Sequence, residues 1–204
     1  MAKRTILVDS ARRELEKHGT ENFPMTVNHD DLWSFEGKNV PIHWHNDLEI
    51  NLIREGEAVF QVYQKSYRVR TGEGFLLNRN VPHSCSSPGN EHVRYSTILV
   101  RPDFLYGDFG SDVERKCFQP FLQNSAIPCI YLTGFDENGK EILQKLNQVE
   151  EAFDRKRFCY ELKIKGLLCE AFAMILYGHR QELTKFVPAN LQELERLEKN
   201  AELS

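Results

Sequence analysis

The sequence predicts a mainly β domain of the sandwich or barrel type, followed by a helical segment. Between about residues 23 and 132, short runs rich in β-branched and aromatic residues alternate with turn residues at close, regular spacing. From about residue 136 onward, apolar residues instead recur every three or four positions, which is the period of a helix. Two blocks of glycine, histidine, glutamate and asparagine at fixed spacing lie within the β region and contain its candidate ligand-binding residues.

Length and composition indicate a single globular unit that does not itself bind nucleic acid. The chain has 204 residues, 41% hydrophobic and 27% charged, which suffices for one good core with an appendage. Its net charge of -4 argues against phosphate binding, which depends on clustered Lys and Arg. The scattered cysteines contain no CxxC pair, which indicates free thiols in a reducing compartment. Because no signal-peptide-like or membrane-spanning run is found, we expect a cytoplasmic protein with no membrane partner.

The β region follows a charged N-terminal segment. Residues 1–21 are weakly amphipathic, and we expect them to form an arm or short helix outside the core. Turn residues separate short strand-like runs, which cover residues 49–53, 58–63, 66–70, 74–77 and 93–100. Prolines and glycines break this rhythm over residues 101–130, where one short helix is expected near residues 113–118.

Two helices and the start of a third are expected after the β region. The first begins near residue 136, where one apolar line runs at helical spacing through Ile142, Leu146, Val149 and Phe153. The second, from about 158 to 177, is apolar nearly all round, so we expect it to be covered on two sides. A third begins near Pro188, a favoured first-turn residue. The expected division is an arm (1–21), a β domain (22–135), a helical pair (136–182) and a tail helix (183–204).

The two polar blocks place three imidazoles and a carboxylate in the β region. They contain, in order, Gly37, His43, His45, Glu49 and Gly56, then Gly72, Asn78, Asn80 and His83. Since side chains alternate along a strand, His43, His45 and Glu49 share parity, and His83 from a later strand could meet them. Three nitrogens and one oxygen suit a borderline divalent metal. The same groups could instead form a polar floor for a sugar-like ligand, or be a relic of an ancestral metal site.

These blocks resemble the paired signature motifs of the cupin superfamily. The first block matches at every fixed position, whereas the second has Asn78 and Asn80 where Pro and Gly are usual. More narrowly, residues 43–50 (HWHNDLEI) and 78–84 (NRNVPHS) are similar to the N-terminal sensor domain of AraC-type transcriptional regulators, with Arg79 replacing a common proline. Similarity extends to further segments of the chain, at residues 18–20, 54–57, 101–107 and 160–165.

The resemblance implies a cupin-like jelly-roll β-barrel, then an α-helical hairpin and a linker helix. It implies a homodimer that senses a small polar effector, such as a sugar, with His43, His45, Glu49 and His83. The same four residues are the candidate ligands of a divalent transition metal, Zn, Ni, Mn or Fe. DNA would be contacted only through two helix-turn-helix units expected beyond Ser204. The alternative to this non-enzymatic role is a stand-alone metal-dependent cupin enzyme, of the dioxygenase or sugar isomerase type.

Overall fold

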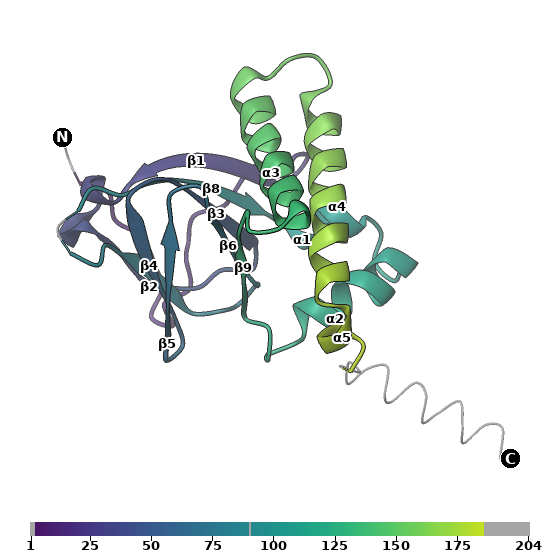
Figure 1. The fold of residues 1–204 in the computed structure, drawn as a ribbon, viewed down its shortest axis with the longest axis horizontal. Coiled ribbons are helices and arrows are strands. Elements are labelled where there is room, and N and C mark those ends of the chain that lie inside the picture. The colour runs from purple at the N-terminus through teal and green to yellow at the C-terminus, as the bar shows by residue number, and fades with distance from the viewer. Residues whose placement is uncertain (1–2, 90, 186–204) are drawn as a thin grey trace, which may run out of the picture.

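The computed structural model describes residues 3–89 and 91–185, which form two antiparallel sheets and a helical hairpin (Figure 1). One sheet has five strands in the order β1-β8-β3-β6-β9, and the other has four in the order β2-β7-β4-β5. The strands are β1 Met25–Asp31, β2 Asn39–His43, β3 Leu48–Glu55, β4 Glu57–Val62, β5 Lys65–Arg70, β6 Gly74–Leu77, β7 His83–Ser86, β8 Arg94–Val100 and β9 Cys129–Leu132. This confirms the predicted mainly β, cupin-like jelly roll with C-terminal helices, with one correction. The two sheets form a sandwich and do not close into a barrel.

The central strand β3 is buried on both faces over residues 48–53, although apolar and polar residues alternate over residues 48–52. Leu48, Ile50 and Leu52 point to the helical side of the five-stranded sheet and join the larger apolar core there. The alternate residues Glu49 and Asn51 point between the two sheets, where a second apolar core lies around Phe60 and Phe75. The strand thus carries structural side chains on one face and polar side chains on the other.

Two long helices cover the outer face of the five-stranded sheet. α3 (Glu137–Arg155) and α4 (Tyr160–Gly178) pack against each other, and α4 runs along α3 at the end of the molecule away from the four-stranded sheet (Figure 1). Asp136 caps α3 by accepting a hydrogen bond from the amide of Gly139 at 2.7 Å. Both helices lie within a few residues of the predicted ones. None of the helices within residues 3–89 and 91–185 is long and apolar enough to cross a membrane.

Short helical turns fill the remaining connections. They are η1 (Leu32–Ser34), η2 (Glu36–Lys38), α1 (Pro102–Tyr106), the π-helical turn η3 (Val113–Phe118), α2 (Gln119–Leu122) and α5 (Arg180–Leu183). η3 falls where the sequence predicts its short helix. The tail helix expected from Pro188 lies outside the described residues.

The N-terminal segment contains no helix over residues 3–21 and does not stand apart from the fold. We call residues 4–18 the strap. Backbone hydrogen bonds hold it against the jelly roll: the amide of Arg4 donates to Ser34 at 2.9 Å, and that of Glu14 donates to Trp44 at 2.9 Å. Of the two expected forms, an arm or a short helix, the structure has no helix here, and several polar side chains of the segment line the interior cavity.

The three motif glycines share a backbone conformation that other residues rarely adopt. Gly37, Gly56 and Gly72 have φ values of 70°, 85° and 87°. They differ in their surroundings. A Cβ at Gly56 would lie 2.3 Å from the carbonyl oxygen of His92, whereas a Cβ at Gly72 would meet nothing within 4 Å.

This contrast predicts unequal effects of the same substitution. Gly72→Ala should lower the free energy of unfolding by about 1–2 kcal/mol, the cost of a left-handed backbone for an L-residue. Gly56→Ala carries that cost plus a backbone clash and should lower it by about 1–3 kcal/mol more. Urea unfolding of both variants measures the difference. Equal destabilisation would show that the approach of His92 to Gly56 does not constrain the turn.

Candidate ligand and metal site

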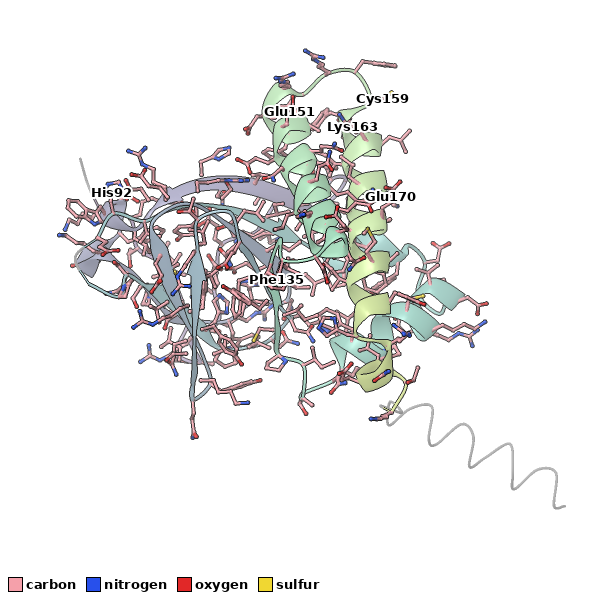
Figure 2. All side chains as sticks on the ribbon, in the orientation of Figure 1. His92, Phe135, Glu151, Cys159, Lys163 and Glu170 are labelled. Atoms are coloured by element: carbon pink, nitrogen blue, oxygen red, sulfur yellow. The ribbon has the colours of Figure 1, made fainter. Side chains whose placement is uncertain are left out.

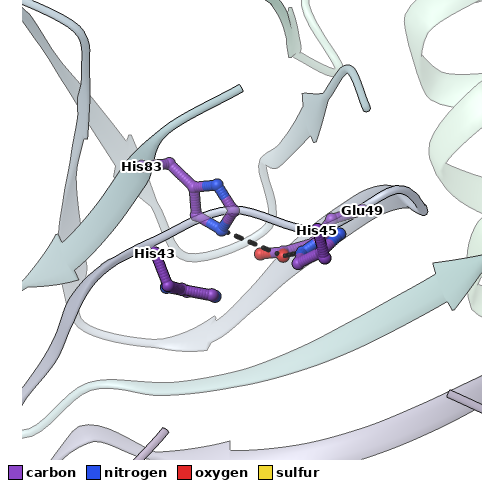
Figure 3. Close-up of side chains that lie close together, drawn as sticks. All are labelled: His43, His45, Glu49 and His83. Carbon is purple, nitrogen blue, oxygen red and sulfur yellow. Dashed lines mark hydrogen bonds and ion pairs between the residues drawn. The ribbon is translucent and has the colours of Figure 1, made fainter. Parts of the chain in front are cut away.

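The four predicted site residues meet between the two sheets. His43 ends β2 and His83 begins β7, and these two residues are paired in the ladder of the four-stranded sheet. Glu49 lies in β3 of the opposite sheet, and His45 lies in the connection between β2 and β3. One ligand atom of each residue lies within 4.8 Å of the others, and all four residues are buried (Figure 3).

The route to this convergence differs from the one that the sequence predicts. Parity along one strand was expected to align Glu49 with His43 and His45. However, β2 ends at His43, and β3 begins at Leu48 in the other sheet. The connection turns a corner, so Glu49 faces the imidazoles from across the sandwich. The single-strand argument is wrong for Glu49, although the four side chains do lie together.

Backbone carbonyls orient all three imidazoles in the same way. Each Nδ1 lies within hydrogen-bonding distance of a carbonyl oxygen two residues away, at 2.9 Å for His43 to Pro41, 3.2 Å for His45 to Asp47 and 2.8 Å for His83 to Val81. Since a carbonyl only accepts, each Nδ1 must donate. Metal-binding histidines are held in this manner. The Nε2 atoms of His45 and His83 face Oε2 of Glu49. Because a carboxylate oxygen only accepts, a ring nitrogen that bonds to it donates, and its lone pair becomes free for a metal only when that proton leaves.

Glu49 is held from both sheets. Its Oε1 accepts a hydrogen bond from the side-chain Nδ2 of Asn51 at 2.7 Å. The side-chain Oδ1 of Asn51 in turn accepts one from the hydroxyl of Thr97 at 3.0 Å. Its Oε2 lies 2.8 Å from Nε2 of His45 and 3.2 Å from Nε2 of His83 (Figure 3). Nε2 of His83 is buried and has no aligned hydrogen-bond partner in the described part of the chain. Its contact with Glu49 is therefore an ion pair that lacks hydrogen-bond alignment.

Burial and neighbouring charge separate the protonation states of the cluster. Burial alone would raise the pKa of Glu49, but the charge on His83 and the hydrogen bond with His45 outweigh it and hold the pKa well below its usual range. Burial alone would lower the pKa of His83, but the Glu49 charge outweighs it and raises this pKa. Burial lowers the pKa of His43 to about 4, and the charge on His83 adds to that effect. At neutral pH the cluster thus offers one carboxylate and at least one neutral imidazole.

A small cavity of about 50 Å³ adjoins the cluster. Polar side chains line it beside His43, Glu49 and His83; they include Asn28, Asp30, Asn51 and Thr97. Phe60 and Tyr95 supply apolar wall. The cavity has room for a few water-sized groups, and it is well below the ~300–1,000 Å³ of pockets that hold larger ligands. A sugar therefore fits only if part of the wall moves.

Apart from Phe35, the part of the wall that lies outside both sheets comes from the strap. Arg4, Glu14 and His18 line the cavity from the strap, and Arg4 forms an ion pair with the buried Asp30. The backbone amide of Trp44, which lies between two site histidines in sequence, donates to Arg12 in the strap at 3.1 Å. The N-terminal segment therefore forms one side of the cavity beside the cluster.

Two strap residues approach the imidazoles. His18 lies between Asp47, whose Oδ2 is 2.8 Å from Nδ1, and Glu14, whose Oε1 is 3.6 Å from Nε2. Burial alone would lower the pKa of His18, but these two carboxylates outweigh it and raise the pKa to about 10. Burial alone would raise the pKa of Glu14, but His18 outweighs it and lowers this pKa. Sequence reasoning missed both residues, because a Glu and a His four apart in a charged arm are typical of a solvated surface.

Among residues 3–89 and 91–185, one further grouping of potential metal ligands is found. His29, Glu150 and Asp154 offer ligand atoms within 4.8 Å of one another at the junction of β1 and α3. His29 is exposed, and the guanidinium of Arg54 already pairs with Glu150. This grouping links the sheet to the helix, and a protein cation already balances part of its charge.

The fold and the cluster together define a class of protein, a cupin-like domain with a buried polar cluster between its sheets. Comparison with known proteins narrows that class. Residues 32–172 match the family model of the AraC-like ligand binding domain. Because this match covers more than half of the chain, the chain belongs to that family.

A curated relative agrees with this family. The chain is 23% identical over 161 residues to an uncharacterized HTH-type transcriptional regulator, YdeC, from Bacillus subtilis (strain 168). The match covers 79% of the chain but 54% of that protein, so the chain spans about half of its relative's length.

Solved structures show likeness in fold. ToxT from Vibrio cholerae O395, solved with a methylnaphthalenyl butenoic acid, is 16% identical with a TM-score of 0.48, covering 73% of this chain and 55% of that one. A cupin-2 domain protein from Shewanella frigidimarina NCIMB 400 is 19% identical with a TM-score of 0.33, covering 41% and 76%. At these TM-scores the likeness carries no information about ligand or activity.

The charge on His18 predicts how the strap responds to pH. A group whose pKa is raised on folding stabilises the fold fully below its unfolded pKa, about 6.5. That contribution is lost as pH rises toward the folded value of about 10. His18→Gln should therefore lower the free energy of unfolding by about 2 kcal/mol near pH 6 and by progressively less from pH 7 to pH 10.

Thermal melts of both proteins across this pH range measure the effect. The control is His92→Gln, at the end of the molecule opposite the helical hairpin (Figure 2), where His92 pairs with Asp31 on the surface. A difference between wild type and His18→Gln that stays constant with pH would contradict a charged His18 in the folded state.

Proposed function

We propose that this chain is the effector-sensing and dimerisation part of an AraC-type transcriptional regulator. Its effector is a small polar molecule, such as a sugar or sugar derivative, bound beside His43, His45, Glu49 and His83. The observation that carries this proposal is a buried polar cluster facing a cavity in a domain of the AraC-like ligand binding family. A binding role without chemistry agrees with that family and with the regulator-like relative.

The lining suits a hydroxylated ligand. Amide and hydroxyl side chains such as Asn28, Asn51 and Thr97 can each donate and accept, as sugar hydroxyls require. Because the strap lines a cavity too small for a sugar, an effector of that size would enter when the strap is displaced or rearranged. Binding then shifts the population of strap arrangements, which is a means of regulation by population shift.

The cluster also suits a divalent transition metal. The Nε2 atoms of His43, His45 and His83 and the carboxylate of Glu49 would hold it, and the oriented Nδ1 atoms support this fit. Zn, Ni, Mn and Fe accept such mixed nitrogen and oxygen ligands. When bound, the metal would act as a Lewis acid toward an oxygen of the effector.

DNA contact belongs to another part of the regulator in this proposal. The relative is named as an HTH-type regulator, and the chain corresponds to about half of its length. The net charge of -4 makes this part a poor partner for a phosphate backbone. The sensor would therefore act on DNA through a linked helix-turn-helix domain.

A second candidate is a stand-alone metal-dependent enzyme, either a dioxygenase or a sugar isomerase. It is favoured by the set of three oriented imidazoles and one carboxylate, which leaves coordination positions open on an octahedral ion. Turnover by the purified chain loaded with Mn²⁺ or Fe²⁺ distinguishes the two. The sensor proposal expects binding without product, and catalytic turnover would favour the enzyme.

The binding proposal predicts a ligand-dependent rise in thermal stability that requires the cluster. The probes are monosaccharides and sugar alcohols, each with and without Zn²⁺ or Mn²⁺. A probe at about 100 times its Kd adds about 2.7 kcal/mol, which raises Tm by about 5–11 °C for a chain of this size. His43→Gln should abolish the rise, whereas the surface control His92→Gln should keep it. A rise that survives His43→Gln would place the ligand elsewhere.

The dimerisation surface proposed here is the outer face of α4. Exposed residues at helical spacing follow one side of it: Leu162, Gly166, Ala173 and Tyr177. Leu162 is 72% exposed and Tyr177 67%, although the opposite side of the helix is fully buried. Figure 2 labels Cys159, Lys163 and Glu170 along this helix, at the end of the molecule away from the four-stranded sheet. Apolar exposure of this kind is typical of an interface.

Charge placed on this face should separate the subunits. Leu162→Lys should convert a dimer into a monomer at about 10 μM, a range suited to moderate affinity. Phe109→Lys is the matched control, because Phe109 is 90% exposed but lies outside α4. Sedimentation equilibrium distinguishes the variants. A wild-type monomer at this concentration, or equal dissociation by both variants, would contradict the proposed surface.

A further inference from the structure

Glu14 is a second carboxylate that faces the imidazole cluster from the strap. Its Oε2 lies 3.8 Å from Nε2 of His43, and its side chain is only 5% exposed. It lines the same cavity as Glu49 and His83. The backbone fixes this position, because the amide of Glu14 donates to the carbonyl of Trp44, the residue between the two histidines of the first motif block.

The strap and the adjacent turn also orient this carboxylate. His18 lies four residues further along the strap. Its Nε2 is 3.6 Å from Oε1 of Glu14, and its Nδ1 is 2.8 Å from Oδ2 of Asp47. The ring of His18 stands edge-on to that of His45, with centroids 5.5 Å apart. One oxygen of Glu14 therefore faces His18, and the other faces the cluster.

The distance between Glu14 and His43 suits two ligands of one ion. Nitrogen and oxygen ligands lie about 2.0–2.2 Å from a borderline divalent metal. Two ligand atoms of the same ion are therefore separated by about 3–4 Å, depending on the angle between them. The observed 3.8 Å between Glu14 and His43 falls within that range. Glu14 lies outside the group of four ligand atoms that are all within 4.8 Å of one another, so its side chain would join the ion through a shift of the strap.

Charge balance favours the same role. A dication held by neutral imidazoles and by Glu49 alone would leave one positive charge buried between the sheets, and an uncompensated buried charge is costly. Glu14 would neutralise it. His18 and Asp47 form a pair of opposite charge, so they do not change this sum.

We propose that Glu14 is a fifth ligand residue of a divalent-cation site formed with His43, His45, Glu49 and His83. The proposal rests on the metal-binding part of the proposed function. In this proposal a strap residue binds the cation directly. Cation binding and docking of the strap therefore stabilise each other. This coupling is reciprocal by thermodynamic linkage.

The test is binding of Zn²⁺ and Co²⁺ to the purified chain at fixed pH, measured by calorimetry and by visible absorption of the Co²⁺ form. Glu14→Gln keeps the size of the side chain and removes its charge. The matched control is Glu21→Gln, the same change close to the strap, because Glu21 is 80% exposed and pairs with Arg101 away from the cavity. Thermal melts verify that each variant is folded, and Glu14→Asp serves as a second variant that keeps the charge.

We expect Glu14→Gln to weaken Zn²⁺ binding by about 10- to 100-fold and to change the Co²⁺ absorption, which reports coordination number. Glu21→Gln should bind as wild type does, and Glu14→Asp should fall between the two. Zn²⁺ should also protect the strap from trypsin at Arg12, Arg13 and Lys17 in wild type but not in Glu14→Gln.

Two results would overturn the proposal, and they are distinguishable. Equal Zn²⁺ affinity and identical Co²⁺ spectra for wild type and Glu14→Gln would remove Glu14 from a site that otherwise stands. No binding of either ion by wild type would overturn the cation site as a whole. Effector binding would still be judged separately by the sugar melts in the absence of metal.

Discussion

The ionised carboxylate of Glu49, buried between two sheets, is the constraint on which the rest of the site depends. A buried charge costs several kcal/mol unless partners surround it. Here the partners come from every side: Asn51 from the same strand, His45 from the corner that links the sheets, and His83 from the opposite sheet. Satisfying one carboxylate therefore requires both sheets to be in register, and it brings three imidazoles to one point.

The strap extends the same electrostatic argument to the N-terminus. Arg4 reaches Asp30 in the interior, and His18 bridges Glu14 and Asp47. The strap is held by backbone hydrogen bonds and ion pairs, and only one of its apolar side chains, Ile6, packs against the core between the sheets. A cavity with such a wall suits a sensor, because ligand binding must change something that the rest of a regulator can detect.

The strand β3 connects this site to the helical hairpin. Glu49 and Asn51 face the cavity, whereas Leu48, Ile50 and Leu52 on the other face contact the core beneath α3 and α4. At one end of the same sheet, Arg54 of β3 pairs with Glu150 of α3. A shift of β3 would therefore move side chains both in the cluster and in the core beneath the hairpin, which carries the proposed subunit interface.

Local patterns in the sequence determined the order and type of the elements. Alternating short strands, the amphipathic period of α3 and the motif glycines are properties of neighbouring residues, so they could be predicted without knowledge of the packing. The four motif residues could also be predicted as a group, because their types and spacing indicate a shared polar site. Parity along one strand, however, gave the wrong reason for the position of Glu49.

Only the tertiary structure decided how the site is built and closed. The corner between β2 and β3, which places Glu49 opposite His43, depends on the pairing of strands far apart in sequence. The approach of Glu14 and His18 depends on a hydrogen bond between the strap and Trp44, about thirty residues away. Nothing local marks these two side chains, since a charged arm has the same composition whether water or a buried cluster satisfies it. Long-range pairing of backbone groups supplies that information, and it exists only once the chain has folded.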